Sequence, residues 1–183
     1  MRVAVPLPKC YRLINHGPTT LITSAHAGRR NVMAAAWVMG IDFDPPRVAA
    51  VIAEGTYTRS LVEASGEFVI AVPTAAQTAL TRALGSESGS GVDKFAKHAL
   101  AVEPASKVAP PLIAGCAAWL ECRVIPEPAI AQRYDLFVAE VVAAWADDAS
   151  FRDGRWAFPD DAHRTIHHVA GGHFLRTGDP VGP

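Results

Sequence analysis

Three separated stretches of the sequence carry side chains that could hold a flat, phosphorylated molecule. The first runs over residues 31–37, where small residues stand between Asn31 and Trp37. Small side chains let a planar ring approach the backbone, whose N–H and C=O groups can then bond the polar edge of the ring. On composition alone, a tightly packed core strand is the commoner explanation of such a stretch.

The second stretch, residues 55–60, places hydroxyl groups and the guanidinium of Arg59 at the expected start of a helix. Free N–H groups and the positive end of the helix dipole favour an anion there, and an arginine adds charge-assisted hydrogen bonds. This pattern is compatible with a phosphate site, although an ordinary N-cap beside a solvated arginine is the slightly commoner explanation. The third stretch is Lys94, which follows the glycine-rich segment 86–91 and could reach a ring carbonyl or a phosphate; a lysine after a polar loop is usually just solvated.

Other common site patterns are missing from the sequence. Gly91 is followed by Val92 rather than by the Lys and Ser or Thr of a P-loop, and no G-x-G-x-x-G of a dinucleotide-binding fold occurs. His163 and His167 are four residues apart without the H-E-x-x-H form, so we expect no metal site. No serine or cysteine stands in a nucleophile elbow, which gives hydrolase chemistry little support.

The elements that must position these side chains are mostly strands. The first half alternates short β-rich apolar runs with turn signals, which is typical of a barrel or sandwich. Strands are predicted over residues 19–25, 31–40, 47–53, 67–72, 117–124 and 134–144. Helices are predicted over 59–64, ending at Ser65-Gly66, and over 74–84, before Gly85, with a mobile loop over 86–91. Near the end, His167-His168 and the glycines that follow predict a strand edge and a turn close to a pocket or subunit contact.

Size and charge narrow the function classes. At 183 residues and 50% hydrophobic content, the chain is expected to form one domain, residues 1–183. The 17 basic and 18 acidic residues give a net charge of -1, so we expect no nucleic-acid partner. No apolar run reaches the roughly 20 residues that cross a bilayer, and two early prolines replace the apolar core of a secretory signal, so we expect no membrane partner and a cytoplasmic protein. The three cysteines, an odd number, predict reduced and buried thiols.

Taken in order, short segments covering nearly the whole chain resemble the flavin-reductase-like family, in particular its flavoredoxin branch. The matching segments are residues 16–24, 31–38, 44–46, 57–61, 65–69, 92–95, 120–122 and 167–168. The resemblance implies a mainly β fold with a few flanking helices, the FMN-binding split barrel. It also implies a homodimer with flavin mononucleotide (FMN) near the subunit interface.

The resemblance assigns the site by position. The cofactor-binding residues would be Asn31, Val32, Met33, Ala34, Ala36, Trp37, Thr56, Thr58, Arg59, Ser60 and Lys94, with Arg133 and Tyr134 as weaker candidates for the far side of the pocket. No catalytic acid or base is expected, because hydride transfer to a flavin can proceed with stacking and hydrogen bonds alone. Relatives usually carry a hydroxyl residue where this chain has Ala34-Ala35-Ala36. Each missing hydroxyl removes a possible bond to the flavin of about 1 kcal/mol.

Three functions are compatible with these features. The first is an oxidoreductase of the flavin reductase type, in which NADH or NADPH binds transiently and passes hydride to FMN, and the electrons go on to an acceptor or partner. The second is a flavin-binding protein that exchanges electrons with a protein partner and does not turn over nicotinamides. The third is a flavin-free structural relative whose alanine strand has closed the pocket.

Overall fold

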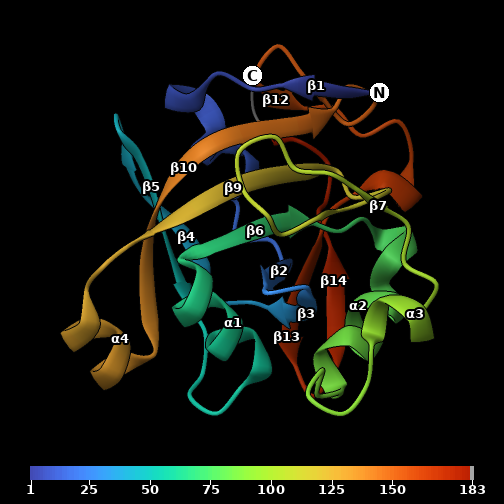
Figure 1. Ribbon diagram of the computed structural model, residues 1–183. Helices are drawn as coiled ribbons and strands as arrows, with labels where there is room; N and C mark the ends of the chain where they lie inside the picture. Colours follow the sequence, from blue (N-terminus) through green and yellow to red (C-terminus); the bar gives the residue numbers. More distant parts are fainter. Residues whose placement is uncertain (182–183) are drawn as a thin grey trace.

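A strongly curved antiparallel sheet dominates the computed structural model, which describes residues 1–181 (Figure 1). The strand order is β3-β2-β6-β9-β10-β5-β4, and β1 pairs with the end of β10. The two ends of this order, β3 and β4, follow each other in the chain, so the sheet curls back toward itself. The strands are β1 (Arg2–Ala4), β2 (Thr20–His26), β3 (Arg29–Ala35), β4 (Val38–Phe43), β5 (Pro46–Val51), β6 (Glu67–Val72), β9 (Ala118–Ile125) and β10 (Leu136–Asp147).

Strand β6 shows why the core has two parts. Phe68 and Ile70 join one hydrophobic cluster, whereas Val69 and Ala71 join a second cluster. Successive side chains of a strand point to opposite faces, so an uninterrupted apolar run suits a strand that is buried on both sides. The second cluster includes residues of α2 and α3, which therefore cover one face of the sheet. The predicted strand 67–72 is confirmed.

Short helices flank the sheet. Helix α1 begins after Thr56, whose Oγ1 accepts a hydrogen bond from the backbone N–H of Arg59, and ends at Gly66, whose φ of 70° suits a residue without a side chain. The predicted end at Ser65-Gly66 is confirmed, while the start lies two residues earlier than expected. The helices are η1 (Leu7–Leu13), α1 (Tyr57–Ser65), η2 (Ala75–Gln77), α2 (Thr78–Ser86), α3 (Lys94–Lys97), α4 (Pro128–Tyr134) and η3 (Asp161–His163).

The predicted strand 31–40 is wrong as a single element. The chain leaves β3 after Ala35 and enters β4 at Val38, so Ala36 and Trp37 form the connection between them. The predicted helix 74–84 begins as the short η2 turn and continues through Gly85 to Ser86 as α2. The break between β3 and β4 lies in an apolar stretch without proline, so the sequence carries no local signal for it.

The tail forms two small hairpins. They consist of β11 (Phe151–Arg152) with β12 (Arg155–Trp156), and of β13 (Ile166–Ala170) with β14 (His173–Arg176); a further pair joins β7 (Val102–Glu103) to β8 (Leu112–Ile113). Gly171 and Gly172, both with positive φ, make the turn of the second hairpin. The predicted strand edge and glycine turn at His167-His168 are therefore confirmed.

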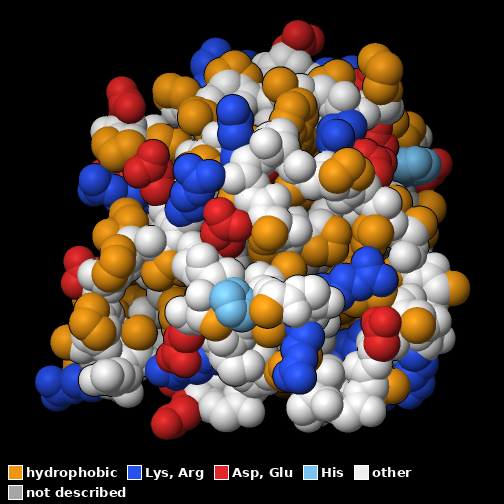
Figure 2. Space-filling view, in the orientation of Figure 1, with side chains coloured by type: hydrophobic (Ala, Val, Ile, Leu, Met, Phe, Trp, Pro, Cys, Tyr) orange, Lys and Arg blue, Asp and Glu red, His pale blue; other side chains and the backbone are white. Residues whose placement is uncertain are grey.

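The surface carries both signs of charge. Figure 2 shows acidic and basic side chains interspersed with apolar ones over the face displayed. The cysteines Cys10, Cys116 and Cys122 are buried and unpaired, as predicted. Among the helices within residues 1–181, none has the length and apolar character needed to cross a bilayer.

Candidate functional site

Asn31 connects the first two predicted stretches. Its side chain is buried on β3, and Nδ2 donates a hydrogen bond to Oγ1 of Thr58 on α1 over 2.9 Å. The glycine-rich loop covers the same spot, because a Cβ at Gly89 would lie 2.0 Å from Asn31 Oδ1. Strand β3, the start of α1 and the loop 86–91 therefore meet at Asn31.

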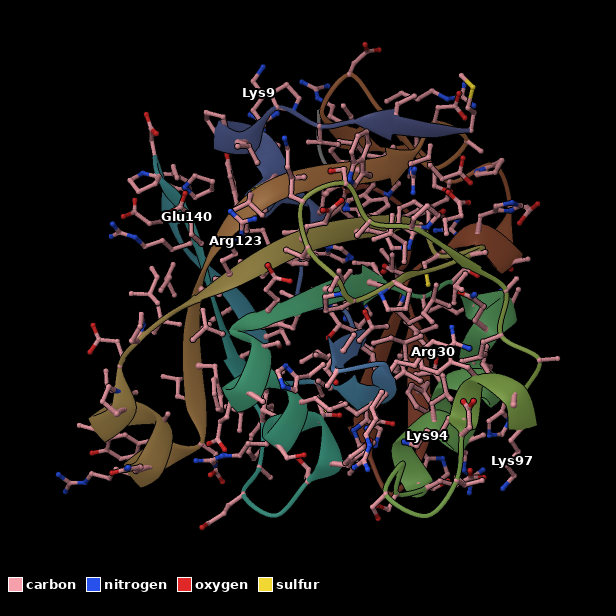
Figure 3. The ribbon with its side chains drawn as sticks, viewed as in Figure 1. Lys9, Arg30, Lys94, Lys97, Arg123 and Glu140 are labelled. Carbon is pink, nitrogen blue, oxygen red and sulfur yellow. The ribbon has the colours of Figure 1, made fainter. Side chains whose placement is uncertain are left out.

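Lys94 attaches the third stretch to the same strand. Asp93 caps α3 by accepting hydrogen bonds from the backbone N–H groups of Phe95 and Ala96. The Lys94 side chain is 2% exposed, and its Nζ donates to the carbonyl oxygens of Val32 (2.8 Å) and Leu84 (2.7 Å). Burial lowers the pKa of Lys94, and Glu87 partly opposes this. Figure 3 shows Lys94 in the region of α2 and α3, with Lys97 at the outer rim.

Lys94 is therefore not the mobile, solvated side chain that its position after a polar loop favours. It is a buried cross-link between β3 and the end of α2. An ammonium has three donors, and two of them are occupied by these carbonyl groups.

The turn before α1 borders a cavity of about 470 Å³. The cavity is lined by Glu54, Gly55, Thr56, Tyr57, Arg59, Ser60, Glu63, Ser90 and Gln132. Hydroxyl groups and the first N–H groups of a nine-residue helix lie at its wall, which is the arrangement that favours an anion. The exposed Ser60 donates its own hydroxyl to the carbonyl of Tyr57 over 2.8 Å.

Arg59 is already occupied by protein groups. Its side chain is only 7% exposed; Nε donates to Glu63 (2.8 Å), Nη1 to Asp135, and Nη2 to the carbonyl of Ala131 (3.1 Å). Hydrogen bonds donated to Glu63 and then to Asp135 raise the pKa of Arg59, so the guanidinium stays charged. A phosphate in the cavity would therefore compete with these carboxylates for the guanidinium, and Glu63, at 53% exposed, is the more accessible one.

The alanines after Asn31 border a second cavity of about 400 Å³. It is lined by Thr19, Ala34, Ala35, Ala36, Thr81, Arg82, Gly85, Ser86, His168, Gly171, Gly172 and Phe174. Val32 and Met33 pack into the two hydrophobic clusters, so these predicted residues face the core. Trp37 is 74% exposed and lines neither cavity.

The loop 86–91 borders both cavities. Ser86 lines the cavity beside the alanines and Ser90 lines the cavity beside α1. The structure thus brings Asn31, Thr58 and Lys94 together by direct contacts of their elements and leaves Trp37 outside. Arg133 and Tyr134 belong to the end of α4, where Tyr134 is exposed.

Sequence reasoning missed Arg82 and Phe174 as cavity residues. The glycine pair after His167-His168 was the available signal, since it predicted a turn close to a pocket. The hairpin reaches this cavity because β13 pairs with the chain before β2, where the backbone N–H of Thr19 donates to the carbonyl of Ile166 over 2.7 Å. Such a long-range contact leaves no local signal in the sequence.

The curved antiparallel sheet and the comparisons with known proteins point to the same protein family. The chain belongs to the flavin reductase-like domain family, whose model matches residues 12–161. Its fold is the split β-barrel of that family, so the predicted mainly β class is confirmed.

Particular relatives cover almost the whole chain. Uncharacterized protein YddH of Escherichia coli (strain K12) is 44% identical over 182 residues, 98% of this chain and 96% of that protein. The crystal structure of an FMN-binding domain of a flavin reductases-like enzyme from Shewanella baltica OS155 has a TM-score of 0.96 at 43% identity and covers 100% of this chain and 97% of that one. The flavoredoxin of Desulfovibrio vulgaris (Miyazaki F) shares the fold, with a TM-score of 0.79 at 24% identity over 91% of this chain and 90% of that one.

Proposed function

We propose that this protein is an FMN-binding oxidoreductase of the flavin reductase type, which takes hydride from NADH or NADPH and passes electrons to an acceptor or partner. The observation that carries this proposal is the 43% identity, over the whole chain, to a solved protein described as an FMN-binding domain. The two cavities on either side of Asn31 support it from within this chain.

The phosphate end of the cofactor fits the cavity beside α1. Thr56 and Ser60 place hydroxyl groups at the start of that helix, and Arg59 supplies a permanent positive charge, while the predicted Thr58 is buried and holds Asn31. The helix dipole adds to the attraction for an anion. We expect the phosphate to take the place of Glu63 on the guanidinium, because no other protein partner of Arg59 is as exposed.

The ring end fits the wall formed by Ala34 and Ala36. Their methyl groups leave a cavity of about 400 Å³, a volume in the range of small-molecule sites. Asn31 and Lys94 then lie behind this wall, where they fix the strand and the end of α2, and we propose that their role is to hold the pocket in shape. Trp37, on the exposed connection after β3, would reach a bound ring only by way of a second subunit.

Bound FMN would supply the two-electron chemistry. The protein would orient the ring through the backbone of β3, and a reduced nicotinamide would lie transiently over it. We name no catalytic acid or base for this step, since no proton needs to move in hydride transfer to a flavin held by stacking and hydrogen bonds.

We propose that the protein works as a homodimer joined through β4. Exposed apolar side chains gather on this edge strand and on the connection before it: Trp37 (74%), Met39 (58%), Ile41 (46%) and Phe43 (60%). Exposed apolar side chains gathered along an edge strand mark interfaces between proteins. We expect Met39→Glu with Phe43→Glu to give a monomer by sedimentation; a wild-type protein that sediments as a monomer at micromolar concentration would end this proposal.

We also propose that residues 1–183 act as one domain, which agrees with the full coverage by the Shewanella structure. The cytoplasmic location stays a prediction.

The visible spectrum of purified protein, before and after addition of FMN, tests the cofactor. Mixing the FMN-loaded protein with NADH or NADPH and following the nicotinamide absorbance tests the activity. Turnover no faster than with free flavin would exclude the reductase, and a yellow protein reduced only by another redox protein would identify an electron carrier. A colourless protein that gains no thermal stability from excess FMN would be a flavin-free relative, because a ligand of the native state must stabilise it.

A further inference from the structure

The outer wall of the cavity beside the alanines comes from the tail of the chain. Hairpin β13–β14 spans residues 166–176, beyond residue 161 where the match to the family model ends. It is nevertheless fixed to the barrel: the backbone N–H of His168 donates to Thr19 Oγ1 over 2.7 Å, and His167 Nδ1 lies 2.9 Å from the carbonyl of Gly17. This wall is thus an ordered part of the cavity that the family match does not include.

The two walls of this cavity would suit a flat ligand. The methyl groups of Ala34 to Ala36 line the cavity from the barrel, and the rings of His168 and Phe174, whose centroids are 5.2 Å apart, line it from the hairpin. The glycine turn between β13 and β14 adds backbone without side chains. Apolar surface on one side and aromatic faces on the other favour an aromatic ring.

Charge gives the second requirement. None of the residues that line the cavity is acidic, and Arg82 is the lining residue with a permanent positive charge. Within residues 1–181, Arg82 takes part in no salt bridge, and its side chain in no hydrogen bond. Its guanidinium rests on the turn, since a Cβ at Gly172 would lie 3.2 Å from Arg82 Nε. A planar guanidinium without a partner is the group that recognises carboxylates.

We propose that Arg82, the alanine wall and hairpin β13–β14 form a subsite for a small aromatic carboxylate. The proposal rests on the proposed function in one respect: Ala34 and Ala36 also belong to the expected flavin wall, so a ligand bound here lies beside the flavin ring. Arg82 recognises the carboxylate, and Phe174 and His168 cover the ring. The hairpin therefore selects which molecule can approach the cofactor.

Benzoate is the probe and benzyl alcohol its neutral counterpart. Both are titrated into FMN-loaded protein, and the change of the flavin absorption spectrum gives the dissociation constants. We expect Arg82→Gln to weaken benzoate binding by about tenfold or more and to leave benzyl alcohol unchanged, because only the charged ligand loses its charge-assisted hydrogen bonds. Phe174→Ala is expected to weaken both ligands.

Arg29→Gln is the matched control, since it removes the same charge from an exposed residue at the start of β3, outside the cavity. Equal benzoate binding by Arg82→Gln and wild type, or an equal loss in Arg29→Gln, would overturn the proposal. Benzoate that raises the dissociation constant of FMN would also overturn it, because the cavity would then belong to the flavin alone. If the protein takes up no FMN, the proposed function fails, and calorimetry of benzoate with the flavin-free protein still decides whether Arg82 binds a carboxylate.

Discussion

The arginines of the two cavities beside Asn31 differ in their burial and in the partners that the protein supplies for their charge. In the cavity beside α1, Arg59 is buried and has two carboxylates and a carbonyl as partners. In the cavity beside the alanines, Arg82 is exposed and rests on a glycine turn. Arg59 already has protein anions as partners, so a ligand anion must compete with them. Arg82 has no such partner among residues 1–181, so a ligand anion would add a new one.

The elements between the cavities explain how both can exist on one strand. Lys94 holds β3 to the end of α2, and Gly89 brings the loop onto Asn31. Each contact joins parts of the chain that the sheet alone would leave apart. Disturbing these contacts should affect both cavities, whereas changes at either arginine should affect only one.

The largest effect is expected from Lys94→Met. The substitution keeps an unbranched side chain, one atom shorter, but removes the donor to the carbonyls of Val32 and Leu84, which should lower the free energy of unfolding by roughly 3 kcal/mol. Urea denaturation measures the change. Lys97→Met on the same helix is the control: its pair with Glu87 is exposed, and we expect a loss below about 1 kcal/mol. Equal losses in the two variants would show that Lys94 is not a structural cross-link.

Acid should loosen the hairpin cavity before the cavity beside α1. Burial, with His167 close by, lowers the pKa of His16 to about 4. Its Nε2 lies 2.9 Å from Thr165 Oγ1, which leads into β13. An unfolded histidine titrates near pH 6.5, so the contribution of neutral His16 is complete above that pH and is lost as the pH falls toward 4.

The expected loss is about 2 kcal/mol between pH 6.5 and 4, measured by denaturation at each pH. His16→Gln should flatten this part of the pH profile, whereas His26→Gln, at the exposed end of β2, should not. Binding of benzyl alcohol, which does not titrate in this range, should weaken while FMN binding persists. A parallel loss at both sites would mean that acid acts on the whole barrel and not on the hairpin.

Local signals in the sequence predicted the strands and turns better than they predicted the fate of charged side chains. The apolar run of β6 and the glycine that ends α1 are local features, and both elements were predicted correctly. The break at Ala36 was missed because it depends on the pairing of β4 with β5, and no residue near Ala36 indicates that pairing. The burial of Lys94 was missed for a similar reason, since one of its carbonyl partners lies 62 residues away.

The same limit applies to Arg59. Its residue type and its place in the first turn of a helix predict an anion partner, and the structure supplies one from Asp135, 76 residues further along the chain. Sequence alone could not distinguish a phosphate from an internal carboxylate, because both satisfy a guanidinium in the same way. The sequence therefore predicted that Arg59 has an anion as its partner, but it did not predict that the anions are carboxylates of the protein itself.

The smallest effect is expected from Glu63→Gln. This variant tests whether the phosphate replaces Glu63 on Arg59 or is only attracted by the overall charge of the cavity beside α1. Removing the charge that holds Arg59 Nε should free the guanidinium and tighten FMN by about threefold, as expected for an exposed ion pair. Riboflavin, which lacks the phosphate, should bind Glu63→Gln and wild type equally. Fluorescence titration measures both ligands.

Glu54→Gln is the control for this last variant, because Glu54 lines the same cavity while its carboxylate has no contact with Arg59 among residues 1–181. A general reduction of negative charge would tighten FMN equally in the two variants, and the exchange of Glu63 for phosphate would then be wrong. An effect of Glu63→Gln on riboflavin of the same size would place the change at the ring end of the cofactor. Tighter FMN binding in Glu63→Gln alone would show that the Glu63 carboxylate competes with the phosphate for the guanidinium of Arg59.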